Sequence, residues 1–335
     1  MRTDIISDGW GISYPDAISF AFNRNLIRIQ GETDDEVTVT VQRESVSYQD
    51  KRETIGGYVQ FDISEYIRLF FSVKETELVP SLDIEVHVSL GKGGNFNFTM
   101  TCIWGVINIG ETFNSGRKVI WFKNYPQTVS FYSSDNAVQA QSDNEPLKGI
   151  DVTPGIVHLD LDGTFPKAQN HATILLMEEY KAIFDYTFDY TFTSITDNLV
   201  LNIEISNADC GIFIRWIDRH GFYQYWLFNP GDISYKVSDI GEESEVNSTA
   251  FLDVYGITRV QGKETHKTIK ACSPLVDKET FDMLLGLLSS PLPSLWDGNE
   301  WIPIHISEGT STQSTSDLQD FEIQIEMPEL ISQKL

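Results

Sequence analysis

Alternation of apolar and polar residues runs through much of the chain and predicts β-strands. Valines alternate with polar residues over 37–41, and other apolar residues do the same over 84–90, 199–205 and 321–325. Over 184–192 the apolar positions are all aromatic. Successive side chains of a strand point to opposite faces, so this period is typical of strands with one buried face. We therefore expect a mainly β protein.

Two tight turns are predicted between strands. Residues 212–217 and 222–228 are strand-like and flank Asp218-Arg219-His220-Gly221. A second turn is expected at Asp297-Gly298, between Trp296 and Trp301. Glycine adopts the left-handed conformation that such hairpin turns require.

Helical patterns are few. The clearest covers 277–289, with Asp277 as N-cap, and a shorter one begins at Ser64. So little helix argues against alternating α/β architecture. We expect two β-sandwich or barrel-like domains, with one short amphipathic helix in the second. The apolar stripe of that helix is expected to contain Phe281, Leu284, Leu285 and Leu288.

The hydrophobic pattern is interrupted between Ser133 and Gly155, which reads as a linker or long loop. Since 335 residues exceed a typical single core, we expect an N-terminal β domain over 1–148 and a C-terminal β domain over 149–335. One elaborate β domain is the alternative. A second polar stretch, 309–317, is expected to be an exposed loop before the last strand.

The charge is strongly acidic. Lys and Arg total 24 against 49 Asp and Glu, a net charge of -25. Such a chain repels nucleic acid and anionic lipid, so we expect no nucleic-acid partner. The charge favours solubility, or recognition of a basic partner. We also expect no membrane insertion, because no apolar run approaches about 20 residues. The N-terminus lacks an apolar stretch followed by small residues, so we expect no signal peptide and synthesis in the cytoplasm.

No residues have the spacing of a metal or cofactor site, and we expect neither. The cysteines Cys102, Cys210 and Cys272 are widely separated. The histidines are equally scattered, and none stands beside a nucleophile motif. They are His87, His158, His171, His220, His266 and His305.

One short segment suggests catalysis. Asp160-Leu161-Asp162-Gly163-Thr164 follows a strand-like segment and resembles the first motif of haloacid-dehalogenase-type phosphatases. That resemblance implies Asp160 as the phosphoryl-accepting nucleophile and Asp162 as general acid/base, with Mg²⁺. The rest of that family's pattern is missing, and a strand running into an Asp-Gly turn explains the same residues. We therefore predict no enzyme and keep a phosphatase as the third hypothesis.

Aromatic residues are concentrated around the two predicted turns. Alternation buries about half of such rings in a sheet, which makes core packing one interpretation. Exposed rings instead form protein interfaces or stack on sugars. The candidate interface or glycan-platform residues are Trp216, Tyr223, Tyr225, Trp226, Trp296 and Trp301.

Several segments together resemble tail proteins encoded by phages and prophages of gut Bacteroidetes. They are 119–126, the hairpin 215–228, the closing region with 287–291 and 301–304, and the opening with 23–27 and 61–67. The resemblance implies a structural role in a virion tail or baseplate, within a homo-oligomeric ring and beside other tail proteins. It implies no catalytic residues. A carbohydrate-binding β-sandwich that recognises a receptor glycan is the alternative.

Overall fold

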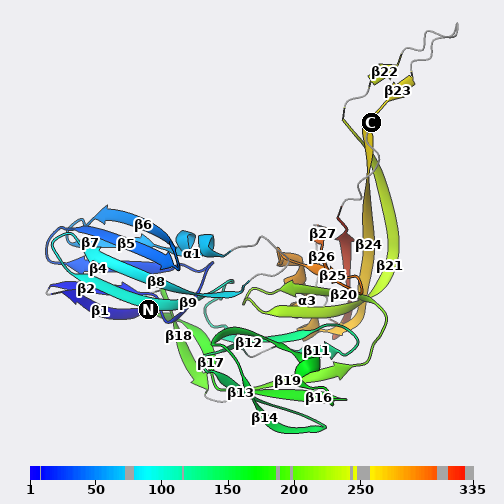
Figure 1. Cartoon of the computed structure of the whole chain (residues 1–335), viewed down its shortest axis with the longest axis horizontal. Coiled ribbons are helices and arrows are strands. Elements are labelled where there is room, and N and C mark those ends of the chain that lie inside the picture. Colours follow the sequence, from blue (N-terminus) through cyan, green and yellow to red (C-terminus); the bar gives the residue numbers. More distant parts are fainter. Residues whose placement is uncertain are drawn as a thin grey trace. The chain divides into compact units, whose positions relative to one another are not determined.

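The computed structural model describes residues 1–7, 9–71, 79–114, 117–185, 189–196, 199–241, 244–246, 257–307 and 316–328. Strands dominate, so the prediction of a mainly β, multi-domain fold is confirmed (Figure 1). Two compact units are present. The first comprises Met1–Asp209 and Trp216–Tyr225, and the second Cys210–Arg215 and Trp226–Leu335.

A β-sandwich begins the first unit. Val37, Val39 and Val41 are buried together with Ile27 and Ile29 of the opposite sheet, as the alternation predicts. Helix α1 (Ser64–Phe70) closes the same core, at the predicted position. One sheet has the order β1 (Arg2–Ser7), β2 (Trp10–Tyr14), β4 (Leu26–Gly31), β7 (Tyr58–Asp62). The other has the order β3 (Ile18–Phe20), β9 (Asn95–Ile103), β8 (Ser81–Leu90), β5 (Glu36–Arg43), β6 (Val46–Glu53).

The remainder of the first unit packs around Trp121, Phe131 and Phe165, which are fully buried. The pair β12 (Thr128–Ser133) and β15 (Gly155–Asp160) leads into helix α2 (Leu161–Thr164). A three-stranded sheet has the order β10 (Thr112–Phe113), β17 (Glu179–Asp185), β18 (Asp189–Thr196). A five-stranded sheet has the order β11 (Val119–Phe122), β19 (Leu199–Ser206), β16 (His171–Leu176), β13 (Ala137–Ser142), β14 (Glu145–Asp151).

The expected linker between Ser133 and Gly155 is instead a β-hairpin. Strands β13 and β14 pair antiparallel within it, and β13 also pairs with β16. Val138 and Ala140 face the core, but their neighbours are polar and small, which weakens the sequence pattern. The expected boundary near residue 148 thus falls inside β14, whereas the compact units divide after Asp209.

The second unit is built on a long sheet and one helix. Its sheet has the order β26 (Trp301–Pro303), β25 (Ser294–Trp296), β20 (Ile212–Ile217), β21 (Tyr223–Ile240), β24 (Gly262–Asp277), β28 (Leu318–Glu326), β27 (His305–Ile306). The ends of β20 and β21 that meet at the hairpin turn belong to the first unit. A separate pair consists of β22 (Ser244–Val246) and β23 (Ile257–Arg259).

Helix α3 (Lys278–Ser289) lies where the sequence predicts it. The Asp277 carboxylate accepts a hydrogen bond from the Thr280 amide at 2.8 Å, so the N-cap is confirmed. Phe281 meets Phe321 of β28 edge-on, with ring centroids 5.2 Å apart. Of the predicted stripe, Phe281 and Leu284 are buried, Leu285 is half-buried and Leu288 is exposed, whereas Leu287 is buried.

Two further predictions concern the loop over 309–317 and membrane insertion. Of the expected loop over 309–317, only 316 and 317 are among the described residues. No helix in the described part of the chain is long and apolar enough to cross a membrane.

Candidate functional site

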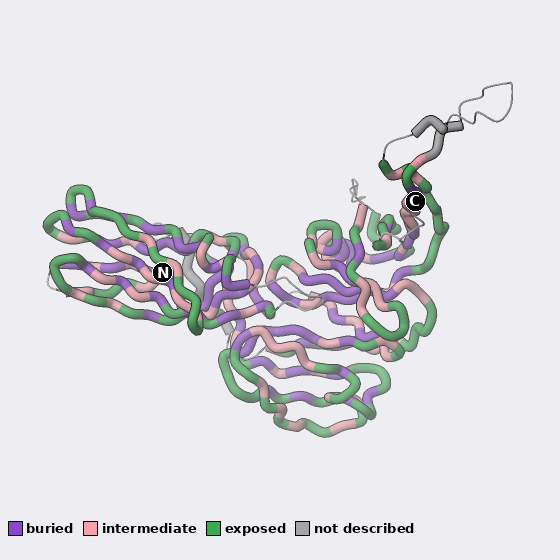
Figure 2. Tube along the Cα trace, turned by 45° about the horizontal axis from the view of Figure 1, so that its top comes forward, coloured by how far each residue is buried: buried purple, intermediate pink, exposed green. Residues whose placement is uncertain are grey.

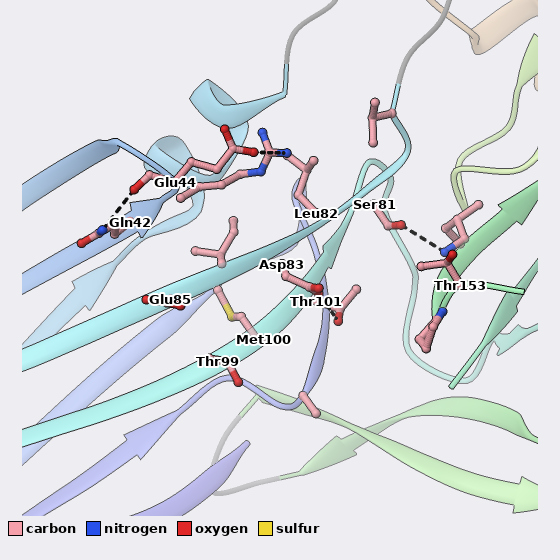
Figure 3. Close-up of a pocket in the computed structure, with 16 residues that line it drawn as sticks. Gln42, Glu44, Ser81, Leu82, Asp83, Glu85, Thr99, Met100, Thr101 and Thr153 are labelled. Atoms are coloured by element: carbon pink, nitrogen blue, oxygen red, sulfur yellow. Dashed lines mark hydrogen bonds and ion pairs between the residues drawn. The ribbon is translucent and has the colours of Figure 1, made fainter. Parts of the chain in front are cut away.

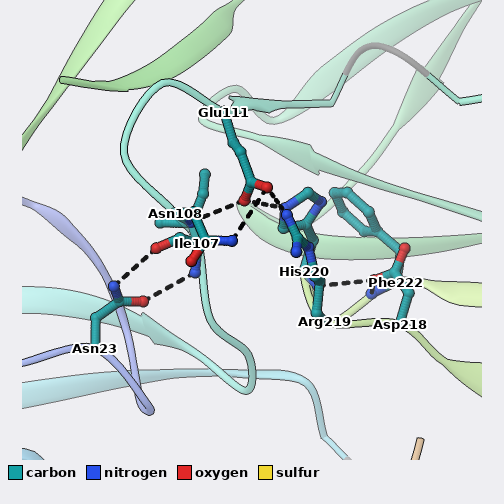
Figure 4. Close-up of polar contacts among 8 residues, drawn as sticks. All are labelled: Asn23, Ile107, Asn108, Glu111, Asp218, Arg219, His220 and Phe222. Carbon is teal, nitrogen blue, oxygen red and sulfur yellow. Dashed lines mark hydrogen bonds and ion pairs between the residues drawn. The ribbon is translucent and has the colours of Figure 1, made fainter. Parts of the chain in front are cut away.

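The tip of the β20–β21 hairpin is organised around the carboxylate of Asp218 (Figure 4). Its Oδ1 accepts hydrogen bonds from the amides of His220 at 2.9 Å and Phe222 at 3.0 Å. Its Oδ2 accepts from Gln224 Nε2 at 2.7 Å. Gly221 has a φ of 82°, which confirms the turn expected from its sequence. One carboxylate thus orders the whole turn.

Glu111 binds the same tip from the loop that follows β9 (Figure 4). Its carboxylate forms an ion pair with Arg219, and its Oε2 lies 3.7 Å from His220 Nε2. The Asn108 amide donates a further hydrogen bond to Oε2 at 2.8 Å. The loop and the hairpin tip are thereby fixed to each other inside the first unit.

Burial sets the protonation of His220 within this network. Removal from water lowers the pKa of His220, because the charged imidazolium loses its hydration. The Asp218 carboxylate raises that pKa, while Arg219 and Arg117 lower it. The net direction is downward, so the neutral imidazole is the favoured form. A neutral, enclosed histidine fits a structural role better than proton transfer to a ligand.

A serine and a histidine also meet in the first unit, which their sequence spacing did not predict. Ser130 on β12 and His158 on β15 are cross-strand partners, and Ser130 Oγ lies 2.7 Å from His158 Nδ1. Ser130 is 0% exposed, and its hydroxyl accepts a hydrogen bond from the Tyr223 amide at 3.0 Å. No substrate reaches a hydroxyl so enclosed, so the pair serves to dock the hairpin.

The six aromatic residues proposed as a platform divide by burial. β20 and the first part of β21 are interior strands of their sheet, so their rings pack against neighbours on both faces. Core packing therefore accounts for half of the set. Trp216, Tyr225 and Trp226 are buried, whereas Tyr223, Trp296 and Trp301 are half-buried.

The half-buried tryptophans form a small cluster in the second unit. The ring centroids of Trp296 and Trp301 are 5.3 Å apart, at the turn that contains Gly298 with a φ of 104°. The Arg215 guanidinium lies 4.4 Å from the Trp301 ring centroid, a cation–π contact. The cluster offers a partly exposed aromatic edge.

Asp160 and Asp162 occupy the junction of β15 and α2. The Asp160 carboxylate accepts a hydrogen bond from the Gly163 amide at 2.8 Å and so caps the short helix. Partial burial and then repulsion from Asp160 raise the pKa of Asp162, which Lys123 lowers. This geometry is described by the non-catalytic interpretation of the segment, a strand that runs into an Asp-Gly turn.

A groove of about 890 Å³ runs along β8 and β9 of the sandwich (Figure 3). Three carboxylates line it, those of Glu44, Asp83 and Glu85. Asp83 accepts a hydrogen bond from Thr101 Oγ1 at 2.8 Å, and Glu44 pairs with Arg43 at 3.2 Å. Its carboxylates suit cationic or hydrogen-bond-donating groups.

The feature that sequence reasoning missed is an antiparallel ribbon in the second unit, residues 229–240 of β21 with 262–272 of β24, called the arm below (Figure 1). Nearly all of β21 within it is exposed (Figure 2). Ile233, Tyr235 and Val237 alternate on one face and are 52%, 60% and 58% exposed. Their alternation is visible in the sequence, but it does not reveal that no second layer covers them.

In the described ranges, no group of three or more His, Cys, Asp or Glu residues could hold a metal ion. Burial raises the pKa of the Cys102 thiol, which keeps it protonated, whereas Cys210 is exposed.

The arm and the Trp296–Trp301 cluster are thus the surfaces best suited to binding.

Comparisons with known proteins place the chain in no family. No protein-family model and no curated protein matches it. Among solved structures, it is similar to a chain from work on the host cell surface retention of a 1.5-MDa bacterial ice-binding adhesin. The sequence identity is 12% and the TM-score 0.18, over 82% of this chain and 94% of that chain.

Proposed function

We propose that this chain is a non-catalytic assembly protein that binds other protein subunits through the arm. The observation that carries the proposal is the exposed apolar row of Ile233, Tyr235 and Val237. A contiguous apolar row on a surface strand marks an interaction site. Beyond the residues of β24 that pair with β28, the arm is a ribbon of two strands. Such a ribbon is marginal in water and gains stability when a partner supplies further strands or covers one face.

The resemblance to tail proteins of Bacteroidetes phages gives this role a setting. A tail or baseplate is built from repeated subunits, and its components act by contact with one another and not by catalysis. The partners are then further copies of this chain and other tail proteins. The net charge of -25 suits such a component, because it opposes random association before the specific contacts form.

Substitution of the arm tests the proposal. The double variant Ile233→Ser/Val237→Ser removes two apolar side chains of the row without touching the core of the sheet. Light scattering after size exclusion should give a mass above 38.0 kDa for the unmodified chain and a mass near that value for the variant. Ile5→Ser is the matched control, since Ile5 is 71% exposed on β1. An arm variant that keeps the mass of the unmodified oligomer contradicts the proposal.

Carbohydrate recognition is the second candidate, favoured by the partly exposed Trp296–Trp301 cluster beside Arg215. Aromatic faces stack on sugar rings. Titration with a panel of bacterial surface glycans should change the tryptophan fluorescence if this candidate holds. Loss of that change in Trp301→Ala, but not in Tyr235→Ser, would assign the binding to this cluster.

A further inference from the structure

The outer edge of β21 is open along the arm. Strand β20 is six residues long and joins β21 through the Asp218–Phe222 turn, so it accompanies only the start of β21. From residue 229 to residue 240, β21 has β24 on one side, and the described residues place no strand on the other. Unpaired amides and carbonyls along such an edge are a template for another strand.

Charges on this edge are arranged for pairing with an identical strand. Edge strands ordinarily carry charges that repel a second copy. Here Asp232 and Lys236 have opposite signs, are both exposed, and lie two positions before and two positions after Ser234 in the sequence, with Asp232 inside the irregularity of β21 between Pro230 and Ile233. An antiparallel copy centred on Ser234 therefore sets Asp232 of each chain opposite Lys236 of the other.

The apolar residues obey the same symmetry. With Ser234 at the centre, Ile233 of each chain is opposite Tyr235 of the other. Aromatic–β-branched pairs and opposite-charge pairs are both stabilising across antiparallel strands. No like charges stand directly opposite each other between residues 231 and 237 in this register.

We propose that two copies of this chain associate by antiparallel pairing of their β21 edges about a two-fold axis at Ser234. The result is one continuous sheet through both chains, with the central strands in the order β24, β21, β21, β24 and the apolar rows of both arms on one face. This inference rests on the proposed function, because it names the partner that the arm binds. The contact is isologous, as expected for a two-fold dimer.

Charge reversal on the full-length chain tests the register. Asp232→Lys and Lys236→Asp each turn two attractive pairs into two repulsive ones and should weaken self-association about tenfold. The double variant Asp232→Lys/Lys236→Asp restores both pairs, so its dissociation constant should return to within about threefold of the original. The two residues are four positions apart on one strand, about 13 Å, so the recovery cannot arise within one chain. Lys167→Asp, an exposed residue of the first unit, controls for net charge.

A disulfide trap gives an independent readout. In a Cys210→Ser background, Ser234→Cys places two thiols on the two-fold axis, where the Cα atoms of facing residues are about 4.5–5.5 Å apart, within disulfide range. Mild oxidation should give a covalent dimer. Ser238→Cys is the matched control, because its two copies are eight residues out of register, about 27 Å apart.

The outcomes separate the two levels of the proposal. If the unmodified chain is monomeric at every concentration measured by analytical ultracentrifugation, self-assembly through the arm is wrong, and this pairing with it. If it associates and loses association in the Ile233→Ser/Val237→Ser variant, but the charge reversals are uncoupled and Ser234→Cys forms no dimer, only the pairing is wrong. Recovery in the double variant together with the Ser234→Cys dimer supports it.

Discussion

Asp218 holds the hairpin tip through three hydrogen bonds to one carboxylate. Hydrogen bonds to a charged group contribute about 1.5–3 kcal/mol each, and their loss leaves turn amides without that acceptor. Asp218→Ala should therefore lower the free energy of unfolding by about 2–4 kcal/mol, measured by urea denaturation. Asp151→Ala, an exposed residue of β14 outside the arm, is the control. A loss for Asp218→Ala no larger than that of the control would contradict this account of the turn.

His220 makes stability depend on pH. Its pKa is lowered in the folded state, chiefly by burial, so the unfolded chain binds a proton at a higher pH than the folded chain does. Stability should therefore fall as the pH decreases below about 6.5, the ordinary histidine pKa, until the folded state also takes up the proton.

The matched comparison is His220→Gln against His171→Gln. The first variant should flatten the decrease in unfolding free energy between about pH 6.5 and pH 5, since a glutamine does not titrate. His171 is exposed, so its replacement should leave the slope unchanged. Equal slopes for His220→Gln and the unmodified chain would show that His220 is not the group responsible.

At the scale of the element, the cap of α3 is the clearest local determinant. Asp277→Ala removes the carboxylate that accepts from the Thr280 amide and should cost about 1 kcal/mol of stability. Thermal denaturation followed by circular dichroism measures this loss. Glu279→Ala, in the same first turn but outside the cap, should have a smaller effect. An unchanged midpoint in Asp277→Ala would mean that packing of Phe281 alone fixes the start of the helix.

Local sequence patterns predicted where the strands and helices lie better than they predicted which faces of these elements are buried. Val37, Val39 and Val41 alternate just as Ile233, Tyr235 and Val237 do, yet the first three are buried and the last three exposed. The difference is the presence of a second sheet over β5, which no local pattern encodes. Alternation over 184–192 likewise spans two strands, since Phe184 pairs with Tyr190 in an antiparallel register.

In the candidate site, too, the sequence predicted the local turn but not which side chains are buried. The Asp218–Gly221 turn followed from its residue types, and the structure adds only the partners of its carboxylate. We grouped the aromatic residues because they lie close to the predicted turns in the sequence. In the structure, Trp216 is buried, whereas Trp301 is half-buried. Strand order decides this, because an interior strand buries both faces and a strand near the edge does not.

At the scale of the whole molecule, charge opposes the proposed assembly. Subunits with a net charge of -25 repel one another over a Debye length, which shortens from about 30 Å at 0.01 M salt to about 8 Å at 0.15 M. Association of the unmodified chain should therefore strengthen between these salt concentrations, measured by sedimentation equilibrium. A weaker association at the higher salt would indicate that attraction between charges dominates the interface.

Hydrogen–deuterium exchange over a range of protein concentrations tests most directly whether the chain assembles through the arm. Amides of residues 231–240 should exchange more slowly as concentration rises, because association supplies acceptors and excludes water. Amides of β6, an edge strand of the first unit, should not change. Arm amides whose exchange is independent of concentration, while the chain associates and other segments become protected, would contradict the account.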